Sequence, residues 1–340
     1  IVAGEVVARV SGMSWEEFVE TMIMQPLDMK MSAASITRLK DRSNIIDAHV
    51  PVDGKLQVVA KHEGDLHNSA GGIMSSVADM SKWVIMQMNN GKYGENLDKQ
   101  IFSEKVHDEM WTPQTIIPVR GKTTYNTHFS MYGLGWGLSD VRGYKQATHT
   151  GGLLGIVTQV TVIPEMKLGI IVFTNQQSGA AFSAITNTIK DSYFGMKGFD
   201  RIKEYKDQVM KNEAEARGIT DAVWQKISEE QKDNHSDIDH AMYTGTFSDS
   251  WFGEVVISQK DGRLWFNSKK SPKLKGEMVF YKGNTFIVKW NDRTLDADAF
   301  VVFSLDKEGM PCGMTMEAIS PLTDFSFDFQ DLSFHRELIN

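Results

Sequence analysis

The chain has 340 residues, of which 41% are hydrophobic and 24% charged, and its formal net charge is -8. These values are typical of folded globular proteins and exclude disordered and fibrous chains. The acidic balance lacks the basic footprint that phosphate backbones require, so we expect no nucleic-acid partner. The longest apolar stretches, such as residues 168–173, are far shorter than the roughly 20 residues that span a bilayer, so we expect no membrane span.

A chain of this length allows about two domains, each with its own core. The single cysteine, Cys312, excludes an intrachain disulfide, and we interpret it as a small buried hydrophobe. The first residues carry neither an initiator methionine nor the basic start of a secretory signal, which indicates a fragment or a processed product. Apolar residues from Ile1 to Val10 recur at helical spacing and end at Gly12, so a helix is predicted there.

Helix signals dominate the next hundred residues. Ser14 and Glu17 form a capping box, and Ser76 is an N-cap candidate with Asp79 three residues on. The predicted elements are a helix from Ser14 to Met24 stopped by Pro26, loops and short strands at 36–64 with a turn at Asp53-Gly54, a glycine-rich turn at 68–72, a helix after Ser76, and a short helix at 103–110.

Strand signals follow in the middle of the chain. Large residues alternate with glycines at 132–137, which predicts a strand packed closely against another backbone. Two apolar runs at 156–163 and 168–174 are joined by a short turn and should pair antiparallel. A closing helix is predicted at 180–193.

The composition changes after residue 200. Residues 201–240 are rich in charged side chains and only thinly apolar, which indicates a solvated helical connector with a domain boundary. From Tyr243 onward, short alternating stretches recur between turn signals, and they predict a small antiparallel barrel or sandwich.

Two motifs contain the residue types of a metal site and of a cofactor site, but their spacing fits neither. His62 and His67 lie five residues apart with Gly64 between them, whereas a zinc-protease helix needs two histidines four apart, so we expect a loop and no metal. The glycines of 133–137 lack the final spacing of a dinucleotide fingerprint, so we expect no cofactor.

The stretch His149-Thr150-Gly151-Gly152 is the best candidate site. A donor or base, a hydroxyl and two residues without side chains stand together at the expected start of a strand, where a ligand could approach the backbone along the strand edge. A tight turn is the alternative interpretation.

Four stretches in order resemble the second half of the serine β-lactamase and penicillin-binding-protein family, in the branch with class C β-lactamases, D-alanyl-D-alanine carboxypeptidases and related esterases. They are NSAGGIMSSVADMSKW (68–83), YGLGWG (132–137), HTGGLLGI (149–156) and VIPEMKLGIIVFTN (162–175), preceded by SWEEFVETMIMQPLDM (14–29) with Asp28 in place of a family glycine. The resemblance implies an α+β chain: a partial β-lactamase-like domain at 1–197 with an antiparallel sheet flanked by helices, a charged helical connector at 198–240, and a small antiparallel β domain at 241–340.

The resemblance also implies roles for the candidate site. His149 takes the place of the third family motif and would organise the electrostatics around the nucleophile. Thr150 and Gly151 would bind the substrate, and the backbone N–H of Gly152 would supply half of the oxyanion hole.

The family's nucleophile motif, Ser-x-x-Lys, and its second motif, Tyr-x-Asn or Ser-x-Asn, are the main departures. The latter is absent, and the former occurs once, at Ser304 to Lys307, where a hairpin turn rather than a helix start is expected. Both family motifs would precede Ile1, so we expect this chain alone to be inactive and its sheet to be incomplete, with apolar surface near 156–173 and self-association as a result.

Two functions therefore stay open. The first is the C-terminal portion of a serine hydrolase that acts on a peptide, ester or β-lactam carbonyl, outside the cytoplasm as the resemblance implies. The second is a non-catalytic module that binds a peptide or a glycan along the strand edge or on the β domain.

Overall fold

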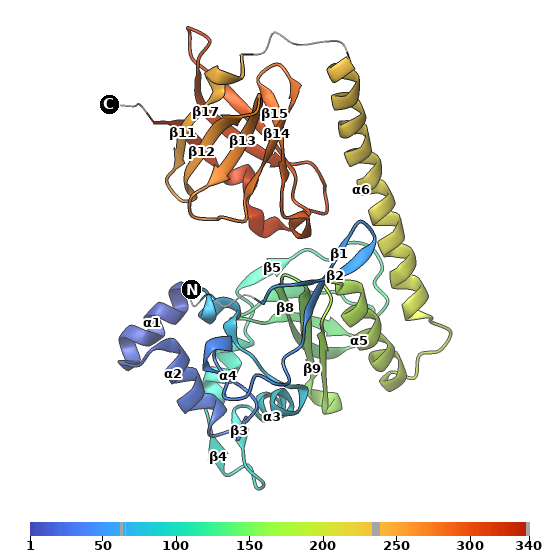
Figure 1. Ribbon diagram of the computed structural model, residues 1–340. Coiled ribbons are helices and arrows are strands. Elements are labelled where there is room, and N and C mark those ends of the chain that lie inside the picture. Colours follow the sequence, from blue (N-terminus) through green and yellow to red (C-terminus); the bar gives the residue numbers. More distant parts are fainter. Residues whose placement is uncertain (62–63, 65, 233–238, 338–340) are drawn as a thin grey trace. The chain divides into compact units, whose positions relative to one another are not determined.

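The computed structural model describes residues 1–61, 64, 66–232 and 239–337. His62, Glu63 and Asp65, from the stretch considered for zinc, lie outside these residues. The chain divides into two compact units, Ile1–Lys206 and Asp207–Asn340, which Figure 1 colours from blue to yellow-green and from yellow to red.

The first unit is a mixed helical and antiparallel β domain. Its elements in chain order are α1 (Val2–Ser11), α2 (Trp15–Val19), the π-helix η1 (Glu20–Met24), the 3-10 helix η2 (Ile36–Arg38), β1 (Ala48–Val52), β2 (Lys55–Val59), the π-helix η3 (Asn68–Gly72), α3 (Val77–Met88), β3 (Lys92–Tyr93), β4 (Lys99–Gln100), α4 (Glu104–Met110), β5 (Thr115–Ile117), β6 (Ser130–Tyr132), β7 (Gly137–Val141), β8 (Tyr144–Leu153), β9 (Ile156–Ile163), the 3-10 helix η4 (Pro164–Met166), β10 (Leu168–Thr174) and α5 (Gly179–Tyr193).

The helix starts are those that the side chains predict. The Ser14 hydroxyl accepts a hydrogen bond from the Glu17 N–H at 3.1 Å, and the Ser76 hydroxyl accepts one from the Asp79 N–H at 3.2 Å. Gly12 ends α1 in the left-handed conformation, which glycine adopts without a Cβ clash. These predicted caps are confirmed.

The main sheet has six strands in the order β10-β9-β8-β7-β6-β5, and each neighbouring pair is antiparallel. The two strands predicted around the Pro164 turn are confirmed as β9 and β10, paired from Leu168↔Ile163 onward. Because successive side chains point to opposite faces, Val162 packs in a cluster with Val84 of α3, whereas Ile163 packs in another with Phe182 of α5. Helices therefore cover both faces of the sheet.

Three details differ from the predictions. The glycine-rich motif at 132–137 is the connection between β6 and β7 rather than one strand, because Gly135 has a left-handed φ of 80° and the Gly133 N–H donates to Trp136 at 2.7 Å. His149 lies in the second half of β8 rather than at its start, since the turn at Arg142 begins that strand earlier. Cys312 is exposed rather than buried.

A buried charge cluster joins the end of α5 to the first residue of α6 (Arg201–Lys232). The Arg201 guanidinium donates two hydrogen bonds to the Asp191 carboxylate at 2.6 and 2.9 Å, and the Tyr125 hydroxyl donates a third at 2.8 Å. Such a bidentate pair is stable in the interior only when its remaining lone pairs are satisfied, as Tyr125 does here. Lys190 lies beside it with its Nζ 3.9 Å from the centre of the Tyr125 ring.

The second unit combines most of α6 with a closed eight-stranded antiparallel barrel. Its other elements are the 3-10 helix η5 (His240–Tyr243), β11 (Gly245–Asp249), β12 (Gly253–Lys260), β13 (Arg263–Ser268), β14 (Lys275–Lys282), β15 (Thr285–Trp290), the 3-10 helix η6 (Arg293–Leu295), β16 (Ala299–Leu305), β17 (Pro311–Ala318), the 3-10 helices η7 (Phe325–Phe327) and η8 (Phe329–Asp331), and β18 (Ser333–Arg336). Of the two architectures predicted, the barrel is the one that forms.

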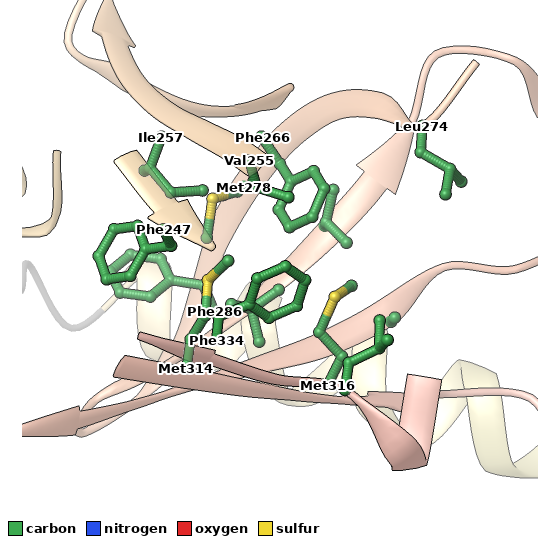
Figure 2. Packing of buried hydrophobic residues seen from close by; sticks show 14 of the residues in the cluster. Phe247, Val255, Ile257, Phe266, Leu274, Met278, Phe286, Met314, Met316 and Phe334 are labelled. Atoms are coloured by element: carbon green, nitrogen blue, oxygen red, sulfur yellow. The ribbon is translucent and has the colours of Figure 1, made fainter. Parts of the chain in front are cut away.

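Aromatic and methionine side chains fill the barrel. Phe247, Phe286 and Phe334 point into one interior from three different strands, with Met278 and Met314 between them (Figure 2). Because these side chains fill the interior, the barrel has a packed core rather than an internal channel. Each fully buried side chain of this kind stabilises the fold by about 1.5–3 kcal/mol relative to leaving it exposed. Outside the barrel, Val223, Trp224 and Ile227 of α6 pack against Ile287 and Ile319. The few apolar residues of the predicted connector thus have a packing role.

In the part of the chain that the structure describes, no helix combines the length and the apolar character needed to cross a membrane.

The buried Lys190 predicts a pH dependence of stability. Loss of hydration lowers its pKa from 10.5 to about 8, a shift that Asp191 opposes and Arg201 reinforces. The folded chain therefore binds fewer protons than the unfolded chain between those pH values, and stability rises across this window by up to about 3 kcal/mol, since one pKa unit is worth about 1.4 kcal/mol.

We expect Lys190→Met to abolish this rise and to stabilise the chain more at pH 7 than at pH 10, as measured by urea unfolding. Lys197→Met, which removes an exposed lysine a few residues on, is the control and should keep the rise. An unchanged pH dependence in Lys190→Met would contradict the assignment.

Candidate active site

The candidate site lies where β8 extends past the end of β7. The tight turn at Arg142 and Gly143 pairs Val141 with Tyr144, and the β7 ladder ends at Gly137↔Thr148. The β9 ladder on the other side continues to Leu153↔Ile156. Residues 149–153 are therefore paired with β9 along one edge and extend beyond the β7 ladder along the other. An extended ligand can add to such an edge as a further strand.

The two glycines of this edge have different environments. A Cβ on Gly151 would lie 2.5 Å from the Thr158 hydroxyl oxygen, so a side chain there would displace its cross-strand neighbour. A Cβ on Gly152 would meet no described atom within 4 Å. Gly151 is thus required for packing, whereas the space over Gly152 is open to a ligand.

His149 is held by hydrogen bonds on both ring nitrogens. Its Nδ1 lies 2.6 Å from the Thr150 carbonyl oxygen, and its Nε2 lies 2.9 Å from the Tyr132 hydroxyl. Because a carbonyl oxygen can only accept, Nδ1 carries the proton in the neutral ring, and Nε2 then accepts from the Tyr132 hydroxyl. The two hydrogen bonds together select one tautomer and one ring orientation.

Tyr132 is the residue of this site that the sequence analysis missed. It is the last residue of β6 and is 37% exposed, and it lies beside His149, which is exposed like Thr150. The pattern at 132–137 could have indicated Tyr132 as a site residue, because a tyrosine at a strand end before a glycine turn projects at the edge of a sheet. Only the strand order shows that this end meets His149.

Two other segments support the edge. The predicted glycine-rich turn forms η3, and a Cβ on Gly71 would lie 3.6 Å from the Leu153 side chain. On the far side of the β8–β9 turn, the His49 N–H lies 3.1 Å from the Gly155 carbonyl oxygen and 3.0 Å from that of Asn175. The end of β8 is therefore fixed by contacts on both sides.

The isolated Ser-x-x-Lys match lies in the second unit. Ser304 is in β16, and Lys307 is in the turn that follows, with its exposed amine 3.4 Å from the Glu308 carboxylate. A strand and turn do not place the two side chains on one helical face, as the family mechanism requires. Within the described residues, no group of three or more His, Cys, Asp or Glu side chains could hold a metal ion.

An antiparallel sheet with helices on both faces and an exposed His-Thr-Gly-Gly edge is the arrangement that the resemblance to serine hydrolases implies. The family model described as Beta-lactamase matches residues 1–192, more than half of the chain, so the chain belongs to the beta-lactamase family of hydrolases. A second model, a domain of unknown function (DUF3471), matches residues 231–336, which include the barrel.

Known relatives are distant and longer. Unguisins hydrolase ungD of Aspergillus violaceofuscus is 23% identical over 286 residues, which are 78% of this chain and 49% of the relative. Beta-lactamase-like protein 1 of Dictyostelium discoideum is 23% identical over 175 residues, which are 48% and 27% of the two chains. Among solved structures, the octameric penicillin-binding protein homologue from Pyrococcus abyssi is 16% identical, with a TM-score of 0.47 over 97% of this chain and 62% of that one. This chain thus spans half or less of the two relatives matched by sequence.

The His149–Tyr132 hydrogen bond predicts the state of the imidazole. In Tyr132→Phe the Nε2 acceptor loses its donor, so the neutral ring should shift from the Nδ1-protonated tautomer toward the Nε2-protonated one. Long-range ¹H–¹⁵N correlation spectra of the histidine side chains measure this directly. Tyr144→Phe removes a hydroxyl from the first residue of β8 and should leave His149 unchanged. The same tautomer in both variants would contradict the assignment.

Proposed function

We propose that this chain forms the substrate-side wall of a serine hydrolase that transfers the acyl group of a peptide, ester or β-lactam to a serine and then to water. The observation that carries the proposal is the open edge of β8 at residues 149–153, with unfilled space over Gly152. Here the backbone N–H of Gly152 would donate to the developing oxyanion, where one such donor is worth about 3–4 kcal/mol.

The other residues of the edge then have separate tasks. Thr150 is exposed and would donate its hydroxyl to a carboxylate of the substrate. Gly151, whose lack of a side chain is required by Thr158, would contribute its backbone to substrate binding. His149 with its Tyr132 partner would present a fixed array of hydrogen-bonding groups beside the nucleophile.

We further propose that the nucleophile is supplied from outside this chain and that the hydrolase domain is incomplete here. The sequence supports this, because its one Ser-x-x-Lys is in the barrel and it has no Tyr-x-Asn or Ser-x-Asn. One structural feature supports it: β10 is an edge strand of the main sheet. The expected apolar surface near 156–173 does not occur, because the apolar side chains there are buried or half-buried, and the exposed Val2, Val6 and Val10 lie on α1 instead. Self-association through these surfaces is part of the proposal.

The first prediction concerns the chain alone. We expect no burst of product when it is mixed with a chromogenic β-lactam or a p-nitrophenyl ester in stopped flow, because the one Ser-x-x-Lys of the chain starts in strand β16 and does not place the lysine where it could activate the serine. Ser304→Ala serves as the matched variant and should behave identically. A burst that disappears in Ser304→Ala would overturn the proposal.

The second prediction concerns substrate class and needs a polypeptide that joins this chain to a segment with the Ser-x-x-Lys helix. Thr150→Val keeps the shape and removes the hydroxyl, so it should lower kcat/KM by about 10- to 100-fold for a substrate with a carboxylate, since a hydrogen bond to a charged group is worth about 1.5–3 kcal/mol. A neutral ester should be hydrolysed at nearly the original rate.

Thr115→Val, on the exposed edge strand β5, is the control for the same change elsewhere in the sheet. If Thr150→Val lowers kcat/KM equally for the carboxylate substrate and the neutral ester, Thr150 does not bind a carboxylate. If the joined polypeptide binds extended peptides without cleaving any of them, the non-catalytic binding function replaces the hydrolase.

A further inference from the structure

The two ends of the barrel differ. Strands β11 to β18 follow one another around the barrel, so their connections alternate between its ends. One end has the turns at 261–262, 283–284 and 306–310. The other has the connections 250–252, 269–274, 291–298 and 319–332, three of which are longer than any turn at the first end. We call this second end the barrel mouth.

A hollow of about 350 Å³ opens at the barrel mouth, which is within the usual range for small-molecule sites. All four connections line it, through Trp251, Phe252, Ser271, Lys273, Leu274, Leu295, Ser326 and Phe327. The barrel interior beneath is filled by side chains such as Phe266 and Trp290, which are 1% exposed or less. A ligand would therefore sit in the mouth and not inside the barrel.

Side-chain hydrogen bonds tie down two of the connections that form the mouth. The Asp249 carboxylate accepts hydrogen bonds from the N–H groups of Trp251, Phe252 and Ser333 at 2.7–3.0 Å, which ties the first connection to the start of β18. The Asp324 carboxylate accepts from both the N–H and the hydroxyl of Ser326. A mouth built from fixed turns loses little conformational entropy when it binds a ligand.

Apolar side chains in this rigid frame are left exposed to solvent. Phe252 packs edge-on against the core residue Phe334 at 5.6 Å, whereas its neighbour Trp251 is 65% exposed. Phe325, next to two residues that line the hollow, is 85% exposed. Exposed aromatic residues on a rigid turn around a hollow are typical of a binding surface.

The charge of the side chains that line the hollow favours an anionic ligand. Lys273 is the one charged residue among those that line it in the described structure, and the same connection carries Lys269 and Lys270. The connections 291–298 and 319–332 carry aspartates that do not line the hollow, of which Asp324 is hydrogen-bonded to Ser326. The Ser326 hydroxyl already donates to Asp324, and the Lys269 amine pairs with Glu254. A carboxylate would be paired with Lys273, the one charged side chain that lines the hollow in the described structure.

We propose that the barrel mouth binds a small organic carboxylate that carries an aromatic or branched aliphatic group, with the carboxylate at Lys273 and the apolar group against Trp251 and Phe327. The C-terminal residue of a peptide and a free N-acylated amino acid share this chemistry. The barrel mouth belongs to the second unit and the candidate active site to the first, and the test of the mouth requires no enzyme activity.

Isothermal titration calorimetry of the full chain with N-acetyl-L-phenylalanine tests the proposal, with N-acetyl-L-phenylalanine amide as the neutral counterpart. We expect the acid to bind at least about tenfold more tightly than the amide, because a hydrogen bond to a charged group exceeds a neutral one. A peptide ending in free phenylalanine, compared with its C-terminal amide, shows whether a chain terminus is also accepted.

Variants locate the binding. Lys273→Gln should lower the affinity for the acid by about tenfold, to nearly the affinity for the amide. Trp251→Ala should lower the affinity for both ligands. Lys282→Gln, beside a turn at the opposite end of the barrel, and Thr150→Val, in the candidate active site, should leave the affinity unchanged. Both mouth residues are exposed, so thermal unfolding should match that of the unaltered chain.

Three results would overturn the proposal: equal affinity for acid and amide, no effect of Lys273→Gln, or no binding of either ligand at millimolar concentration. Binding of a neutral oligosaccharide in place of the acid would assign the mouth to glycans instead.

Discussion

The candidate site depends on a difference in length between two neighbouring strands. β7 and β8 are joined by a tight turn, but β7 starts only at Gly137, opposite Thr148, whereas β8 continues to Leu153. The chain before β7 cannot prolong the ladder, because it turns at residues 133–136. That turn is fixed where Gly133 comes so close to the Met110 carbonyl oxygen that a Cβ would lie 2.4 Å away. This close approach to α4 supports, together with the turn at Gly135, the place where the open edge of β8 starts.

The same turn brings Tyr132 to His149. β6 ends at Tyr132 immediately before the turn, so its last side chain lies at the end of the sheet where β8 becomes unpaired. The edge is open to a ligand but is not loose, since η3 contacts Leu153 and β1 holds the Gly155 carbonyl. Binding sites of this kind need backbone groups that stay unpaired in the free protein, and such groups persist only when neighbouring segments fix the strand.

The barrel of the second unit differs from the main sheet because it has no open strand edge. Closure pairs every strand on both sides and leaves no sheet edge, so the barrel offers no row of unpaired backbone groups along a strand. Phenylalanine and methionine side chains exclude a ligand from the interior. What distinguishes one end is the length of its connections and the hydrogen bonds of Asp249 and Asp324 that stiffen them. The first unit thus presents a strand edge, and the second presents a set of loops.

The helix caps and the β9–β10 hairpin could be predicted from the sequence because they depend on local interactions. The caps at Ser14 and Ser76 lie within three residues of their partners, and the β9–β10 hairpin follows from two apolar runs around a short turn, so neither depends on distant parts of the chain. The prediction of a strand at 132–137 was wrong because alternation of glycines with large residues is common to a packed strand and a tight turn. The left-handed φ of Gly135, which distinguishes them, depends on contacts with α4.

His149 to Gly152 were predicted as a site from their residue types together with the family resemblance, and their role stays a prediction. The strand content of both halves followed from local patterns. Strand order, barrel closure and the meeting of Tyr132 with His149 required the folded chain. Each joins segments far apart in sequence, and their pairing is decided by shared burial and backbone hydrogen bonds that no local stretch contains.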